Sequence, residues 1–167
     1  MAIAQDSFGM FNGLGYEGQV STIEVNKIVS RLVEEDFIPF GRAVIRGTAR
    51  RSCAPVEATT VAADIIGFTV RSMAQASPTP PNDERKYASG YRVNDVASVI
   101  EDGAMFALCV DGAEGGDSVE VIVSDATNLG RLTAGGNGVV LDLVKWVDDV
   151  EAGKIGEIRV HGLLTTA

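Results

Sequence analysis

Three glycines near the start of the chain have the spacing of a dinucleotide-binding loop. Gly13, Gly15 and Gly18 form G-x-G-x-x-G within the stretch FNGLGYEGQV. In a nucleotide-binding fold this loop follows a buried strand and opens a helix whose N-terminus binds the pyrophosphate. Here the preceding segment is polar, and few helical periods follow residue 40. We therefore interpret the motif as part of a flexible glycine-containing arm and expect no cofactor.

Residues that could act as nucleophiles, bases or zinc ligands are scattered along the chain. His161 is the single histidine, and Cys53 and Cys109 lie far apart, so the set needed for a zinc site is missing. We expect both thiols to be buried and His161 to face solvent or an interface. Ser52 and Ser72 lack the glycine-flanked context of a nucleophile elbow. No catalytic site and no metal site is expected.

Acidic residues gather at two places that are typical of solvated turns. Asp148, Asp149 and Glu151 form one cluster. The stretch DGAEGGD (111–117) has the acids and glycines of a calcium loop, but not the D-x-[DN]-x-[DN]-G order or the closing glutamate. We expect turns at both places.

Length, charge and hydropathy narrow the class of protein. The 167 residues suffice for one domain, and the net charge of −9 disfavours binding to nucleic acid, which requires an excess of positive charge. The N-terminus has no basic region followed by an apolar run, and no stretch approaches the ~18 apolar residues of a membrane span. We expect a protein made in a cytoplasm that binds no membrane.

The elements that would position any functional residue are mostly strands. Alternating patterns predict strands at 41–47, 65–73 and 118–125. In the second strand we expect Ile66, Phe68 and Val70 to share one face, with Thr69 and Arg71 on the other. In the third, we expect Val119, Val121 and Val123 to share a face.

Two further segments are predicted to form hairpins. In residues 96–110, Asp102-Gly103 is a turn signal, and Phe106, Leu108 and Val110 are expected to face inward. Residues 139–162 contain a longer apolar run, a turn at Ala152-Gly153 and a strand with Ile158 and Val160 inside. Residues 77–90, with three closely spaced prolines, and the glycine-rich residues 128–138 are predicted loops.

Residues 21–36 fit two structures equally well. Ser21 and Glu24 have the spacing of a helical capping box. Val25, Val29 and Val33 also fit one face of a strand rich in β-branched residues. Helix and strand both remain open for this segment.

Together these patterns predict an all-β protein. We expect a single β-sandwich or jelly-roll-like barrel of short antiparallel strands. Residues 1–20 are expected to be an extended N-terminal arm, and residues 21–167 the body.

Four segments, taken in their order, resemble the structural cement, or decoration, proteins of tailed bacteriophages. They are IPFGRAVIRG (38–47), GFTVRSM (67–73), the stretch GYRVNDVASVIEDGAMFALCVDGAEGGDSVEVIV (90–123) and VKWVDDVEAGKIGEIRV (144–160). The arm, with its Gly18-Gln19 pair, is also similar, so the resemblance runs from about residue 8 to residue 162. The residues of the structural motif are Phe40, Gly41, Gly67, Val70, Gly103, Trp146 and Gly153.

The resemblance implies a non-enzymatic virion protein on the outside of the capsid. Its partners would be the major capsid protein, whose neighbouring subunits it would bridge, and itself, as a dimer or trimer. We expect Phe8, Met10, Phe11 and Tyr16 of the arm to contact the capsid, because aromatic side chains are favoured interface anchors. The alternative is a carbohydrate-binding or tail-associated β-sandwich module, with Trp146 as its candidate sugar platform.

Overall fold

Strands make up nearly all the regular structure. This computed structural model describes residues 15–72 and 89–162. The strands are β1 (Lys27–Val33), β2 (Ile38–Pro39), β3 (Ala43–Arg46), β4 (Ser52–Pro55), β5 (Ile65–Thr69), β6 (Gly90–Tyr91), β7 (Val96–Leu108), β8 (Ser118–Val121), β9 (Leu132–Thr133), β10 (Val139–Trp146) and β11 (Ile155–Val160). A three-residue 3-10 helix, η1 (Ala62–Asp64), precedes β5. The all-β class is therefore confirmed. Among the described residues, no helix has the length and apolar character that crossing a bilayer requires.

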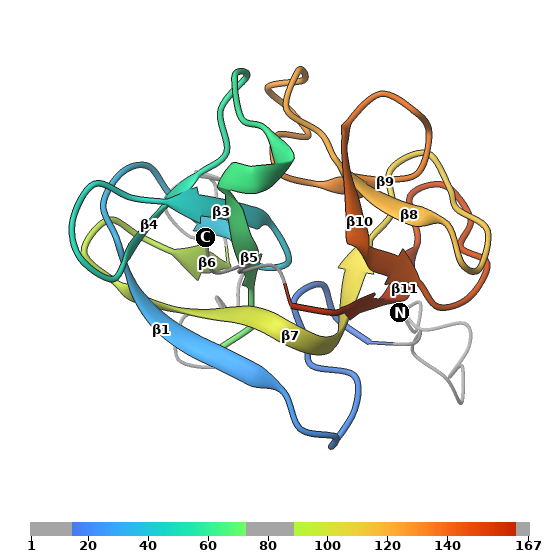
Figure 1. The fold of residues 1–167 in the computed structure, drawn as a ribbon, viewed down its shortest axis with the longest axis horizontal. Coiled ribbons are helices and arrows are strands. Elements are labelled where there is room, and N and C mark those ends of the chain that lie inside the picture. Colours follow the sequence, from blue (N-terminus) through green and yellow to red (C-terminus); the bar gives the residue numbers. More distant parts are fainter. Residues whose placement is uncertain (1–14, 73–88, 163–167) are drawn as a thin grey trace, which may run out of the picture.

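Five of these strands close into a ring. Backbone pairing runs from β1 to β4, β3, β5 and β7, and β7 pairs again with β1. The same sheet continues from β7 through β11, β10 and β8 to β9, so that β7 lies beneath both halves of the molecule (Figure 1). The body is a β-barrel core with extra strands. It is a mixed barrel because β1 and β4 pair in parallel, so the expectation of purely antiparallel pairing is wrong at this place.

The strand β7 is continuous where a hairpin was predicted. It has 13 residues, pairs with β1 and β5 before residue 103, and pairs with β11 from Gly103 onward. Gly103 has φ +129°, and the β1–β7 register shifts beside it, between Lys27 and Ile28. Asp102-Gly103 therefore makes an irregularity within one strand. The predicted turn is wrong because long-range pairing on both sides outweighs the local turn signal.

The face assigned to the second half of β7 is also wrong. Phe106 and Leu108 are only partly buried, as is Val110 just beyond the strand. The fully buried side chains are the alternate ones, Met105, Ala107 and Cys109. Side chains alternate strictly along a strand, so an assignment shifted by one residue exchanges the two faces completely.

Residues 21–36 contain a strand, which settles the alternative left open by the sequence. The strand β1 pairs with β7 over most of its length and with β4 at its end. Val33 is buried in the core, whereas Val25 precedes the strand and is almost fully exposed. Ile28 and Leu32 lie on the outer face of β1, so apolar residues on both faces obscured the strand pattern.

The predicted strands at 41–47 and 65–73 appear as β3 and β5. Every residue of β5 is buried. Phe68 and Val70 belong to the larger core, but Ile66 belongs to a second, smaller one. The expectation that these three share a face is therefore wrong. The cause is a register shift between Val44 and Ile45 of β3, opposite this part of β5.

The C-terminal part follows its predictions closely. Val119 and Val121 are buried on one face of β8, and Val123 packs against the same core. Gly153 has φ +73° in the turn that leads into β11, where Ile158 and Val160 are buried. The strands β10 and β11 then pair antiparallel.

Two remaining expectations concern loops and cysteines. Residues 128–138 are not loop throughout, because they contain the two-residue strand β9. Most of the predicted loop at 77–90 lies outside the described residues. Cys53 and Cys109 are free and fully buried, as expected. Burial raises the pKa of the Cys53 thiol to about 11, which keeps it in its unreactive protonated form.

Candidate functional site

The segment of residues 15–20, here called the root, attaches to the body through its backbone. The Gly18 N–H donates to the Phe106 carbonyl at 2.8 Å, and the Phe106 N–H donates to the Gln19 carbonyl at 2.8 Å. The Arg71 N–H donates to the Gly18 carbonyl at 2.6 Å. A Cβ on Gly15 would lie 2.5 Å from the Phe106 ring, so the root passes directly over this side chain. The root is thus tied to β7 and to the chain that follows β5.

One exposed aromatic side chain marks the root. Tyr16 is 60% exposed, and the Arg71 guanidinium lies 4.9 Å from the centre of its ring. The same guanidinium lies 5.3 Å from the centre of the buried Phe40 ring, which packs edge-on against Tyr91. Arg71 therefore links an exposed ring of the root to a buried ring of the body through cation–π contacts.

A carboxylate of the root lies among arginines of the body. Burial raises the pKa of Glu17, and the charges of Arg42, Arg131 and Arg71 lower it in part. Arg42 is itself buried, and its Nη1 donates to the Leu129 carbonyl at 2.8 Å. The three arginine charges thus offset part of the cost of burying this carboxylate, but burial outweighs them.

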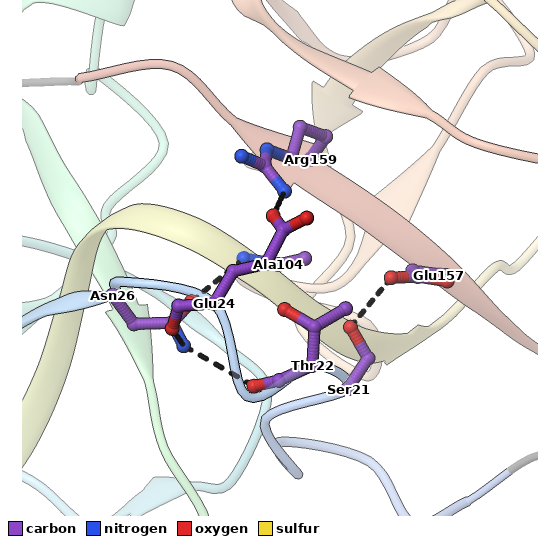
Figure 2. Close-up of polar contacts among 7 residues, drawn as sticks. All are labelled: Ser21, Thr22, Glu24, Asn26, Ala104, Glu157 and Arg159. Atoms are coloured by element: carbon purple, nitrogen blue, oxygen red, sulfur yellow. Dashed lines mark hydrogen bonds and ion pairs between the residues drawn. The ribbon is translucent and has the colours of Figure 1, made fainter.

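Residues 21–26, here called the loop, follow the root and attach through side chains. Figure 2 shows the Asn26 side chain beside the backbone of the loop and of Ala104. Its Nδ2 donates to the carbonyls of Thr22 at 3.3 Å and Glu24 at 2.7 Å, and its Oδ1 accepts from the Ala104 N–H at 3.1 Å. The loop is thereby fixed to the irregular part of β7.

Two further contacts join the loop to β11. The Ser21 hydroxyl donates to Glu157 Oε1 at 2.6 Å, and the Glu24 carboxylate forms an ion pair with Arg159 (Figure 2). The loop is therefore bonded both to β7 and to β11, two strands that pair with each other.

The seven structural-motif residues occupy buried or conformationally restricted positions. Phe40, Val70 and Trp146 are buried in the cores. Gly41, Gly103 and Gly153 have positive φ values, which L-residues with side chains rarely adopt. A Cβ on Gly41 would also lie 2.4 Å from Cγ of Glu17, and a Cβ on Gly67 2.4 Å from the Ile100 carbonyl oxygen.

The expected capsid-contact residues lie in the N-terminal segment. Tyr16 is the member that the structure describes. Phe8, Met10 and Phe11 lie outside the described residues.

The residues considered for chemistry are not brought together. His161 is exposed, and its backbone N–H donates to the Leu143 carbonyl. Asp149 Oδ1 accepts from the Gly115 N–H at 2.8 Å, and Asp117 Oδ2 from the Glu114 N–H at 3.0 Å, so these acids stabilise turns. Among residues 15–72 and 89–162, no group of three or more His, Cys, Asp or Glu is arranged to hold a metal ion.

Sequence reasoning missed the groups that hold the root and the loop. Glu17, Arg42 and Arg131 are far apart in the chain, and no pattern in the sequence indicates that they lie close together. Asn26 sits inside the segment whose structure was left open. Gly103 is the residue that could have indicated this contact, because a glycine is needed where a Cβ would lie 1.9 Å from Asn26 Oδ1. From the sequence alone, it is interpreted as a turn residue instead.

Comparison with known proteins identifies one similar fold and one family. The capsid of Myoviridae phage XM1 contains a chain that matches with a TM-score of 0.71 and 17% identity, covering 98% of this chain and 100% of that one. The N-terminal base of head fibre gp8.5 of bacteriophage phi29 matches with a TM-score of 0.43 and 10% identity, covering 85% and 100% of the two chains. No curated protein sequence matches significantly.

The family comparison covers nearly the whole chain. The model described as structural cement protein (E217 gp24/Pam3 gp6) matches residues 4–161, which include the root, the loop and every described strand. The match confirms the resemblance seen in the sequence. The chain belongs to the structural cement protein family of bacteriophages and is a structural protein of the virion capsid.

Proposed function

We propose that this protein binds the outer surface of an assembled capsid and links neighbouring major capsid subunits. The observation that carries the proposal is the family match over residues 4–161, because it takes in the N-terminal segment together with the body. A cementing protein must contact more than one capsid subunit. The N-terminal segment and the body, which belong to one chain, could each contact a different subunit.

The attachment of the root supports a mechanical role. Gly18, Gln19 and Phe106 are joined by backbone hydrogen bonds, so force on the N-terminal segment passes into β7. This strand pairs with β1 and β5 in one half of the sheet and with β11 in the other. A load applied at the root is therefore spread over the whole body.

In this proposal residues 1–20 are the arm and residues 21–167 the body. Phe8, Met10, Phe11 and Tyr16 are the contact residues of the arm, and the exposure of the Tyr16 ring supports this assignment. Linking two weak contacts on one chain makes the second intramolecular, at an effective concentration in about the mM range. The arm then supplies much of the affinity.

The protein is further proposed to be made in the host cytoplasm, to have no enzymatic activity, and to assemble with itself as a dimer or trimer. Capsid symmetry axes favour such assemblies. The outer face of the β1–β7 pair supports self-association, because Ile28, Leu32 and Val96 are exposed there and Leu32 pairs directly with Val96. Sedimentation velocity over a range of concentrations tests this. A monomer throughout, together with monomeric copies in the virion, contradicts it.

The carbohydrate-binding alternative loses its candidate platform. Trp146 is 1% exposed and packs in the larger core, so its ring cannot stack on a sugar. The capsid role is therefore the function that we retain.

Co-sedimentation with expanded capsids that lack this protein tests the proposal, followed by heating of the particles. We expect saturable binding at a fixed ratio to the shell protein and a higher temperature of capsid disruption. Removing residues 1–14 leaves the root hydrogen bonds in place and should weaken binding at least tenfold. Removing residues 163–167 is the matched control and should leave binding unchanged. Unchanged affinity without residues 1–14 would refute the role of the arm.

A further inference from the structure

Two apolar side chains of the loop are far more exposed than the other large apolar side chains of the described residues. Ile23 is 106% exposed and Val25 is 96% exposed, relative to a fully accessible residue. The other large apolar side chains exposed on residues 15–72 and 89–162 reach at most 60%. Single exposed apolar residues are common on proteins, but two fully exposed β-branched ones at alternate positions of one short loop form a distinct feature.

The backbone that carries these two side chains is fixed. Asn26 bonds to both sides of the loop and to β7, and Ser21 and Glu24 bond to β11. Branching at Cβ restricts χ1 of both exposed side chains as well. Little conformational entropy is then lost when they are buried by a partner, which is the property of a preorganised contact.

The charge of the loop is compensated. Glu24 lies between Ile23 and Val25 in the chain, and its carboxylate is paired with Arg159 (Figure 2). A partner that covers the two apolar side chains therefore does not have to supply a cation for the carboxylate between them. This favours an apolar partner surface over a basic one.

We propose that Ile23 and Val25 insert into an apolar recess on a capsid shell subunit, as a second contact beside the arm. This inference rests on the proposed capsid-binding function. Two side chains are far fewer than the roughly 20 residues a side of a stable interface, so they do not support a dimer of this chain by themselves. On a lattice they need only add to the contact of the arm, and the loop begins at Ser21, immediately after the root.

The test measures binding of the Ile23→Ser/Val25→Ser variant to expanded capsids that lack this protein. The matched control is Val61→Ser/Val140→Ser, which changes two apolar side chains that are 56% and 47% exposed elsewhere on the body. We expect the loop variant to bind at least tenfold more weakly, because each lost apolar contact weakens binding by roughly that factor. We expect the control to bind as the unmodified protein does. Both should unfold at the same temperature as the unmodified protein, since neither change affects the core.

The possible outcomes separate this inference from the function on which it rests. If the unmodified protein does not bind capsids, both fail. If it binds and the loop variant binds equally well, or if the control loses as much affinity as the loop variant, the inference alone is overturned. If the loop variant instead loses self-association in sedimentation velocity without capsids, the occupant is a second copy, and the inference is again overturned.

Discussion

The root and the loop are neighbours in the chain, but they are held to the body by different groups. The root, residues 15–20, is bonded mainly through backbone N–H and carbonyl groups of Gly18, Gln19 and Phe106. The loop, residues 21–26, depends largely on the side chains of Ser21, Glu24 and Asn26. Attachment through the backbone tolerates substitution of side chains, whereas attachment through side chains does not. The root should therefore be robust except at Gly15 and Gly18, where an added Cβ would lie 2.5 Å from the Phe106 ring and 2.8 Å from the Gly41 nitrogen. The loop should be sensitive to single substitutions of its polar side chains.

The largest expected loss of stability comes from Gly103→Ala, which would displace the Asn26 side chain that holds the loop. Gly103 has φ +129°, and the new Cβ would lie 1.9 Å from Asn26 Oδ1. We expect a loss of about 3 kcal/mol or more in the free energy of unfolding, measured with urea, from backbone strain and displacement of Asn26. Gly116→Ala is the control, because φ is +94° but no atom lies within 4 Å of the new Cβ. It should lose only about 1–2 kcal/mol. Equal losses would show that Asn26 is not involved.

A smaller effect is expected from Asn26→Ala. The variant removes the hydrogen bonds to Thr22, Glu24 and Ala104, and we expect about 2 kcal/mol of destabilisation. Hydrogen exchange should become faster in residues 21–26 and stay unchanged at Gly18 of the root. Asn26→Asp keeps the acceptor for the Ala104 N–H but turns a carboxylate oxygen toward the Thr22 and Glu24 carbonyls, so it should not restore the lost stability. Faster exchange at both places would contradict the distinction between root and loop.

The smallest expected effect is a change in pH dependence caused by Glu17→Gln. Burial raises the pKa of Glu17 in the folded protein, so the folded state binds this proton more tightly than the unfolded state does. The stability from Glu17 is complete below the ordinary carboxyl pKa and is lost as the pH rises through the raised one. The difference in unfolding free energy, variant minus unmodified protein, should therefore increase as the pH rises from the ordinary carboxyl pKa through the raised pKa of Glu17. A constant difference would show that the pKa of Glu17 is the same in the folded and unfolded states, which contradicts the prediction. The root should stay attached, because its backbone bonds do not involve this carboxylate.

The features that could be predicted from the sequence are those that depend on a local pattern of residues. The alternation of Val119 and Val121 in β8 and the turn at Gly153 were found because side-chain period and turn chemistry are local properties. The order of four segments was enough to identify the family. The glycine motif was interpreted from its context as part of the arm, and Gly15 of this motif lies against the Phe106 ring.

What depends on long-range pairing was not predicted. Asp102-Gly103 is a strong turn signal by itself, but β1 and β11 supply partners along both parts of β7 and keep it continuous. Ile66 changed faces because of a register shift with the neighbouring strand β3, which no pattern within β5 records. The charges around Glu17 come from three arginines that are distant in sequence and are assembled only by folding.

The closed ring of strands has a consequence for the proposed role on a capsid, where many copies would lie close together. An exposed sheet edge can pair with the edge of another molecule and begin aggregation. Here β1 pairs with both β4 and β7, so the first strand of the main sheet has a partner on each side and is not a free edge. At the other end lies β9, which is two residues long and too short to template an added strand. Among the described residues, the main sheet therefore offers no long free edge through which crowded copies could polymerise by backbone pairing.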